Sequence, residues 1–150
     1  MYSASIIVLS IQPVHGMNIL KGYKKVELRR IQPKYLSPGS LVLLYASSPL
    51  KSLIGAFRVS SIIKKPILEL WEEVEDKACI TLEEFNNYYS DIDSGIAIYF
   101  DETWEFPSPI NLDILRDEMD FQPPQSFRYA TSDDMQLLQH SNISFDLDLL

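Results

Sequence analysis

Residues 21–30 have the sequence Lys21-Gly22-Tyr23-Lys24-Lys25-Val26-Glu27-Leu28-Arg29-Arg30 and contain the spacing G-x-K-x-x-E-x-R. Five cationic side chains surround a single carboxylate in this stretch. Such a run repels itself unless a negative group lies against it, so it indicates a site for an anionic ligand or partner. The alternative is a solvated, charged β-hairpin arm that binds nothing.

A short helix is predicted immediately before this motif. Pro13 suits the first turn of a helix, and Gly22 stands where a helix commonly ends. We therefore expect residues 13–21 to form a helix that leads the chain into the motif.

The motif itself is predicted to form a strand, because apolar and charged residues alternate after Gly22. Val26 and Leu28 then face one way, and Glu27 and Arg29 face the other. Strict alternation from position 24 would put Lys24 opposite Glu27. These two side chains can converge only if the strand begins after Lys24 or carries a bulge there.

The charges of the chain are divided unevenly along its length. The net charge of −8 argues against a nucleic-acid partner, but residues 1–68 hold ten Lys and Arg and only one acidic residue, Glu27. Residues 69–150 hold twenty Asp and Glu and only three basic residues. Because charges are screened within about 8 Å at physiological salt, a positive face can persist on an acidic protein. The acidic part, after residue 68, is in turn a candidate surface for a protein partner.

The remaining pattern predicts an α+β domain. Apolar runs predict strands at 6–9, 41–46, 54–63 and 95–100 besides the motif strand, with a bulge at Gly55. Helices are predicted after Pro66, after Thr81 with a capping box to Glu84, near 112–119, and from Ser132. About five strands without regular β-α-β order favour a small mixed β-barrel with short helices packed around it. We expect one domain over residues 1–130 and an acidic C-terminal extension over 131–150, where alternation at 143–149 favours an edge strand.

Several classes of protein are not expected from this sequence. No apolar run approaches the roughly 20 residues that cross a bilayer, and the N-terminus lacks a basic signal-peptide start. The single cysteine, Cys79, fits a reducing compartment, so we expect a cytoplasmic protein without a membrane partner. His15 and His140 have no partners at ligand spacing, and there is no glycine-rich phosphate or dinucleotide motif, so we predict no metal and no cofactor.

The order of these segments resembles the ASCH domain family of the PUA-like superfamily. The resemblance is carried by the G-x-K-x-x-E-x-R motif, a strand ending Tyr45-Ala46-Ser47-Ser48-Pro49, and a strand beginning Ile54-Gly55-Ala56-Phe57. Leu70-Trp71, residues 80–85 and Pro124-Gln125-Ser126-Phe127-Arg128-Tyr129 are similar to the prokaryotic branch of predicted regulators. The resemblance covers about residues 4–130. It implies a small PUA-like barrel that binds RNA or a nucleotide-like small molecule.

The resemblance also implies a binding cleft beside the barrel. Lys24 and Arg29 suit phosphates, Glu27 suits an exocyclic amine or a ribose hydroxyl, and an aromatic ring can stack on a base. An ion pair of Glu27 with Arg29 or Lys24 that organises the barrel mouth is the alternative. The expected binding residues are Lys24, Glu27, Arg29, Arg30, Tyr45, Ser47 and Ser48; the expected rim residues are Lys21, Lys25, Gln125 and Arg128.

Two alternative roles stay open for single positions. For Arg128, one of three cations in the acidic part, an ion pair with a nearby carboxylate competes with a place on the rim. One branch of the family hydrolyses N4-acetylated cytosine nucleosides with a lysine, a threonine and a distant glutamate. Lys24 matches that lysine, whereas Glu27 and Ala78 stand where the threonine and glutamate would be. If the chain is such a hydrolase of a modified nucleoside, Lys24 and Glu27 are its candidate catalytic residues.

Overall fold

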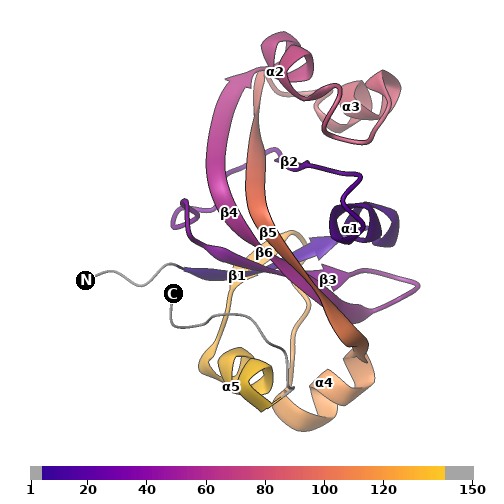
Figure 1. Cartoon of the computed structure of the whole chain (residues 1–150), viewed down its shortest axis with the longest axis vertical. Coiled ribbons are helices and arrows are strands. Elements are labelled where there is room, and N and C mark those ends of the chain that lie inside the picture. Colours follow the sequence, from indigo (N-terminus) through magenta and orange to yellow (C-terminus); the bar gives the residue numbers. More distant parts are fainter. Residues whose placement is uncertain (1–4, 141–150) are drawn as a thin grey trace.

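The structure, a computed structural model, describes residues 5–140 and is an α+β fold built on one six-stranded sheet (Figure 1). The strands are β1 (Ile6–Ile11), β2 (Val26–Arg29), β3 (Leu41–Ala46), β4 (Ser52–Pro66), β5 (Ser94–Asn111) and β6 (Phe127–Tyr129). The helices are α1 (Pro13–Leu20), α2 (Ile67–Val74), α3 (Leu82–Tyr88), α4 (Leu112–Met119) and α5 (Ser132–His140). The predicted fold class is therefore confirmed.

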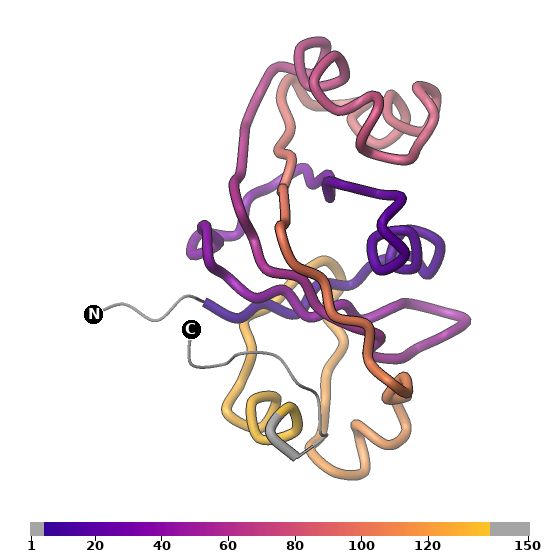
Figure 2. Tube along the Cα trace, in the orientation of Figure 1, coloured from indigo at the N-terminus to yellow at the C-terminus, as the bar shows by residue number. Residues whose placement is uncertain are grey.

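The sheet has the order β2-β5-β4-β3-β1-β6. Only the β1–β3 pair is parallel; the other neighbours in the sheet are antiparallel. The long strands β4 and β5 run side by side along the molecule (Figure 2), and the sheet curls around an inner face as an open half-barrel. β2 at one edge and β6 at the other have no sheet neighbour on their outer sides among the described residues.

Register shifts accompany the change in direction of the long strands. Pairing of β4 with β5 shifts between Leu53 and Gly55 and again on both sides of Val59. The predicted bulge at Gly55 is thus confirmed. A Cβ on Gly55 would lie 2.4 Å from the carbonyl oxygen of Trp104, so only glycine lets β5 approach this closely.

Three apolar clusters hold the fold together, one inside the curl and two outside it. The inner cluster joins β1, β3, β4 and β5 with α1; it includes Leu9, Ile19, Val42, Phe57 and Ile98. Helices α4 and α5 cover the outer face of β1, β3 and β4 through Val8, Leu43, Leu115, Phe121 and Leu138. Helices α2 and α3 cover the outer face of β2 and β5 through Val26, Leu28, Leu70, Val74 and Phe85.

Alternation in β2 decides which residues face the interior of the curl. Val26 and Leu28 are buried against α2 and α3, so Glu27 and Arg29 point to the inner face. The strand begins at Val26, after Lys24, which is one of the two conditions for Lys24 and Glu27 to converge.

The observed elements extend the predicted ones in two places. The predicted strand at 95–100 continues without interruption through Asn111, although 106–109 contains two prolines; its outer part pairs with β4. Strand β6 has no predicted counterpart, because three residues are too short for a repeating pattern and pairing with β1 defines them. The edge strand predicted at 143–149 lies outside the described residues.

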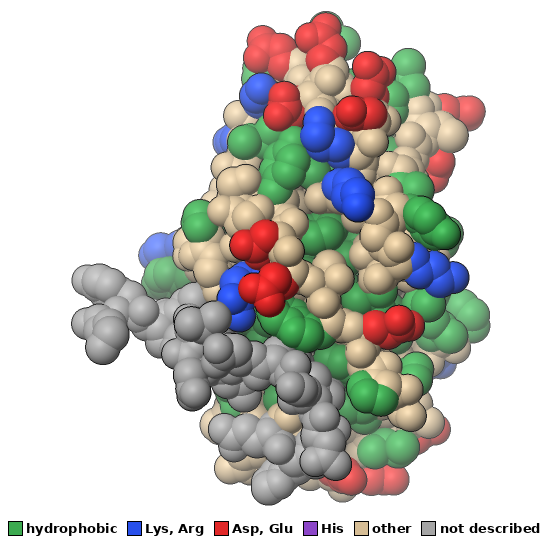
Figure 3. Space-filling view, in the orientation of Figure 1, with side chains coloured by type: hydrophobic (Ala, Val, Ile, Leu, Met, Phe, Trp, Pro, Cys, Tyr) green, Lys and Arg blue, Asp and Glu red, His purple; other side chains and the backbone are tan. Residues whose placement is uncertain are grey.

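Acidic side chains gather on the helices at one end of the molecule. Figure 3 shows Asp and Glu side chains over α2 at the top of this view, and α2 and α3 contain Glu69, Glu72, Glu73, Glu83 and Glu84. None of the helices within residues 5–140 is both long enough and apolar enough to cross a membrane.

Replacing Gly55 by alanine should destabilise the fold, since the new methyl group would clash with the backbone of β5. We expect the free energy of unfolding to fall by about 1–3 kcal/mol, measured by urea denaturation. Ser60→Ala, at an exposed position of the same strand, is the matched control. Equal stabilities of the two variants would contradict the close packing at Gly55.

Candidate functional site

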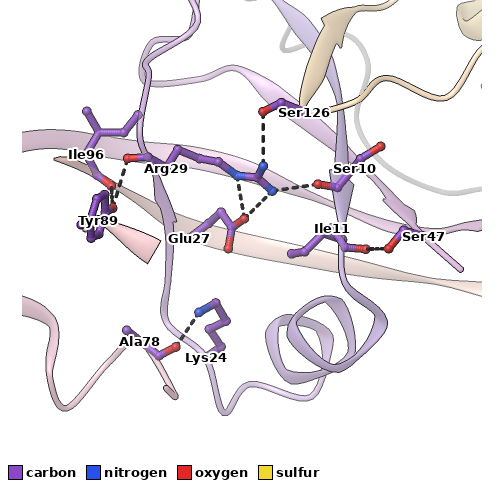
Figure 4. Close-up of polar contacts among 10 residues, drawn as sticks. All are labelled: Ser10, Ile11, Lys24, Glu27, Arg29, Ser47, Ala78, Tyr89, Ile96 and Ser126. Carbon is purple, nitrogen blue, oxygen red and sulfur yellow. Dashed lines mark hydrogen bonds and ion pairs between the residues drawn. The ribbon is translucent and has the colours of Figure 1, made fainter. Parts of the chain in front are cut away.

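A cavity of about 270 Å³ lies where α1, β1, β2 and α3 meet. Its size is near the lower end of the range for small-molecule sites, about 300–1,000 Å³. The G-x-K-x-x-E-x-R motif supplies three of its lining side chains, and Figure 4 shows how they lie. The cavity is lined by Ser10, Ile11, Gln12, His15, Lys24, Glu27, Leu28, Arg29, Ile80, Glu84 and Tyr88; of these, Figure 4 draws Ser10, Ile11, Lys24, Glu27 and Arg29.

Arg29 joins β2 to the opposite wall of the cavity. Its Nη2 lies 2.7 Å from Glu27 Oε2, and its Nε donates to the same oxygen at 2.9 Å. Nη2 also donates to the carbonyl oxygen of Ser10 on β1 at 2.9 Å, and Nη1 makes a longer contact of 3.5 Å with Ser126 Oγ. Tyr89 holds the Arg29 backbone by donating its hydroxyl to the carbonyl oxygen at 3.1 Å.

The Glu27–Arg29 pair is nearly excluded from water. The two side chains are 6% and 13% exposed, so removing one partner would leave a poorly solvated charge. The ion-pair role anticipated for Glu27 is thus present, with Arg29 as its partner. Both contacts from Arg29 are with Oε2 of Glu27, and the Glu27 side chain also lines the cavity.

Lys24 is the most deeply buried charged residue of the site, only 2% exposed. Its Nζ donates to the carbonyl oxygen of Ala78 at 2.5 Å, and within the described residues it makes no ion pair. Burial lowers the pKa of Lys24 below its ordinary value, an effect that the charge of Glu27 partly opposes. The partner of the Lys24 ammonium is therefore a neutral backbone carbonyl rather than a carboxylate.

His15 lies on α1 and borders the same cavity. Its Nδ1 atom is buried and has no hydrogen-bond partner among the described residues. Burial lowers the pKa of His15, and the positive charge of Lys24 lowers it further. The imidazole is therefore neutral at physiological pH.

Helix α3 contributes the far wall of the cavity. Glu84 accepts the backbone N–H of Thr81 at 3.1 Å and completes the predicted capping box. These hydrogen bonds from Thr81 lower the pKa of Glu84 and keep its carboxylate charged. Tyr88, which is 37% exposed, contributes a tyrosine ring to the lining of the cavity.

The three residues expected from the end of β3 do not line this cavity. Tyr45 is buried in the cluster beneath α4 and α5, where its ring lies 5.7 Å from that of Phe121. Ser47 hydrogen-bonds to the backbone of Ile11, which fixes the end of β3 against β1. Ser48 precedes Pro49 in the loop that follows. Tyr45 is displaced because β3 is buried on both faces, and position 45 falls on the outer one.

The other residues expected around the site lie outside the lining of the cavity. Lys21 and Lys25 are exposed beside the motif, and Arg30 pairs with Asp91 at 2.6 Å on the surface. Arg128 pairs with Asp134 at 2.6 Å and lies over the ring of Phe121, so its ion-pair alternative is the one observed. Gln125 is exposed on the segment before β6, next to Ser126.

The cavity contains three ionisable residues that the sequence did not single out as ligands. His15 lacks a partner at any recognisable spacing, and Glu84 is recognisable only as a helix cap. Tyr88 is the last residue of α3 and carries no motif that marks it as a ligand-binding residue. Residues 5–140 contain no cluster of three or more His, Cys, Asp or Glu arranged to hold a metal ion. The arrangement offers proton donors, acceptors and cations in one enclosed space.

A family model, a curated relative and a solved structure all relate this chain to ASCH domain proteins. The ASCH domain model matches residues 9–112. An ASCH domain-containing ribonuclease of Zymomonas mobilis is 29% identical over 132 residues, covering 87% of this chain and 88% of the relative. The crystal structure of ASCH from Zymomonas mobilis superposes with a TM-score of 0.85 at 28% identity, covering 95% and 98% of the two chains.

A more distant structure shares the fold. The N-terminal domain of McrB from Staphylothermus marinus is 14% identical and has a TM-score of 0.58, with 92% of this chain and 94% of that domain covered. This similarity concerns the arrangement of the sheet and helices.

Lys24→Met should change how stability depends on pH. An unfolded chain keeps the Lys24 proton up to about 10.5, whereas the folded protein releases it earlier because burial lowers the pKa. Between these values the unfolded state binds more protons, so the wild type should gain stability relative to the variant as pH rises toward 10.5.

Urea unfolding at a series of alkaline pH values measures this difference. Lys25→Met, a change at the neighbouring exposed lysine, is the control and should track the wild type. If Lys24→Met and the wild type changed in parallel, Lys24 would not be buried as described.

Proposed function

The chain belongs to the ASCH domain family, and on this premise we propose that it binds single-stranded RNA in the cavity that Lys24, Glu27 and Arg29 line. The observation that carries the proposal is the burial of Lys24 without an ion pair among the described residues. A buried ammonium is expensive unless an anion compensates it. A phosphate of the ligand is such an anion.

The other lining groups support a nucleotide rather than a bare anion. The carboxylate of Glu27, which lines the cavity, can accept from an exocyclic amine or a ribose hydroxyl, as carboxylates accept from cytosine. Tyr88 offers a ring on which a base can stack, the role first expected for Tyr45. The volume of about 270 Å³ limits the enclosed part of the ligand to roughly one nucleotide.

Arg29 serves this site mainly by shaping it. Its guanidinium is already engaged by Glu27 and by the Ser10 carbonyl, so it contributes positive potential more than new hydrogen bonds. Exposed Lys21 and Lys25 extend the positive surface beside the cavity and suit flanking phosphates.

RNA cleavage is a second candidate activity. The relative from Zymomonas mobilis that covers 87% of this chain is named a ribonuclease. The side-chain set of the cavity supports the same chemistry here, since a neutral imidazole lies in one space with two cations.

Lys24→Met should weaken RNA binding at least tenfold, because the variant keeps the volume of the side chain and loses its charge. Fluorescence anisotropy of a labelled single-stranded RNA of random sequence, titrated at two salt concentrations, measures the affinity. The variant should also show a smaller dependence of log K on log salt, since one phosphate contact is lost.

Lys25→Met is the control for the loss of one positive charge beside the cavity. It should weaken binding only slightly and to a similar extent for any sequence. Equal affinity of Lys24→Met and the wild type would exclude the cavity as the RNA site.

A further inference from the structure

We propose that the ring of Tyr23 is a stacking platform for the base next to the nucleotide in the cavity, so that the site takes consecutive unpaired nucleotides rather than a free mononucleotide. This inference rests on the proposed binding of RNA in the cavity. It assigns a ligand contact to a residue that does not line the cavity and is not one of the charged positions of the motif.

The side chain of Tyr23 has no partner of its own. Tyr23 is 68% exposed, more than any other aromatic residue in the part of the chain that the structure describes. The other exposed tyrosines there have ring contacts, Tyr35 with Tyr129 and Tyr88 with Tyr89. Tyr23 makes no ring contact, cation–π contact or side-chain hydrogen bond with a described residue. Its ring is therefore available to a ligand.

The backbone fixes Tyr23 at the end of α1. Gly22, with φ of 83°, turns the chain, and its N–H donates to the carbonyl oxygen of Ile19 at 3.1 Å. The N–H of Tyr23 donates to the carbonyl oxygen of Asn18 at 2.9 Å, which completes a Schellman cap. An apolar residue at this position of the cap frequently packs back onto the helix. Here a helix position that would receive it is the polar Asn18, and Tyr23 is exposed to solvent instead.

The residues that follow Tyr23 are held in the same way. The N–H of Lys24 donates to the carbonyl oxygen of Asn18 at 3.0 Å, and the N–H of Lys25 donates to that of Lys77 at 2.8 Å. Every backbone N–H from Gly22 to Lys25 thus has a partner. An ordered loop loses little conformational entropy when a ligand binds, and a tyrosine side chain has few torsions to fix.

The cations beside Tyr23 suit the phosphates of a continuous strand. Consecutive Cα atoms are about 3.8 Å apart, so a strand whose phosphate meets Lys24 in the cavity continues beside the ring of its neighbour Tyr23. Exposed Lys21 and Lys25 form no ion pair with a described residue. The ammonium of Lys25 bends back over the loop, since a Cβ on Gly22 would lie 3.9 Å from it. Cations along the backbone and an aromatic ring against a base together hold single strands of any sequence.

This arrangement distinguishes three forms of nucleotide ligand. A free mononucleotide occupies the cavity and leaves the ring of Tyr23 empty. The bases of a duplex are paired and stacked on one another, so their faces are not open to the ring. A single strand has unstacked bases that can lie on an aromatic side chain. The single strand should therefore bind most tightly.

The test measures affinity by fluorescence anisotropy with the full chain, a labelled single-stranded RNA that contains every base, and the same strand annealed to its complement. Tyr23→Leu removes the ring and should weaken binding of the single strand about tenfold or more. Tyr23→Phe keeps the ring and should bind within about threefold of the wild type. A mixture of nucleoside monophosphates, used as a competitor, should bind Tyr23→Leu and the wild type equally.

The matched control is Tyr35→Leu, a change at a tyrosine that is 60% exposed beside Lys34 and does not line the cavity. It should bind the single strand like the wild type. Tyr23→Leu should keep the wild-type slope of log K against log salt, because it loses no phosphate contact. A shallower slope would mean that the change had displaced Lys24, and the loss of affinity would then not be due to stacking.

Three further results would overturn the inference while leaving RNA binding in the cavity intact. They are wild-type affinity of Tyr23→Leu, equal losses in Tyr23→Leu and Tyr23→Phe, and a duplex that binds as tightly as the single strand. Failure of the wild type to bind the single strand, or equal affinity of Lys24→Met and the wild type, would instead overturn the cavity as the RNA site, and this inference with it.

Discussion

The guanidinium of Arg29 connects two strands that are far apart in the order of the sheet. It extends from β2, at one edge, to the carbonyl oxygen of Ser10 on β1, next to the other edge. Glu27 makes this burial tolerable by neutralising the charge from the same strand. This hydrogen bond joins two walls of the cavity, because Arg29 and Ser10 both line it. Within the sheet itself, the three strands β5, β4 and β3 lie between β2 and β1.

The pairing of Arg29 with Glu27 also decides how the remaining charges are used. Since the single acid of the basic half is committed to Arg29, Lys24 Nζ has a backbone carbonyl as its hydrogen-bond partner within residues 5–140. The positive charge of Lys24 is therefore available to bind an anionic group of a ligand. The same logic applies to Arg30 and Arg128, which have their own carboxylates, Asp91 and Asp134, outside the cavity.

Much of the fold was predictable because its signals are local. Alternation in 26–29, the proline at the start of α1 and the capping box of α3 each fix an element within a few residues. Strand β6 was not predictable, since its three residues become a strand only by pairing with β1.

The motif identified Lys24, Glu27 and Arg29 as neighbours of a cavity. The sequence did not show that Tyr45 lies outside this cavity, because a strand buried on both faces gives no alternation to orient it. His15 was missed as a cavity residue because its neighbours come from β2 and α3, which only the tertiary structure brings to α1.

The pairing of β1 with β6 has a consequence for biosynthesis. The backbone N–H of Ser10 donates a hydrogen bond to the carbonyl oxygen of Ser126, and the side chain of Ser126 contacts the guanidinium of Arg29. The first strand and the motif therefore emerge from the ribosome long before the segment that pairs with β1 and contacts Arg29. Until then, the edge of β1 and the apolar residues of the inner face remain open to other chains. The assembled cavity belongs to the finished protein, and a nascent chain that carries the whole motif still lacks it.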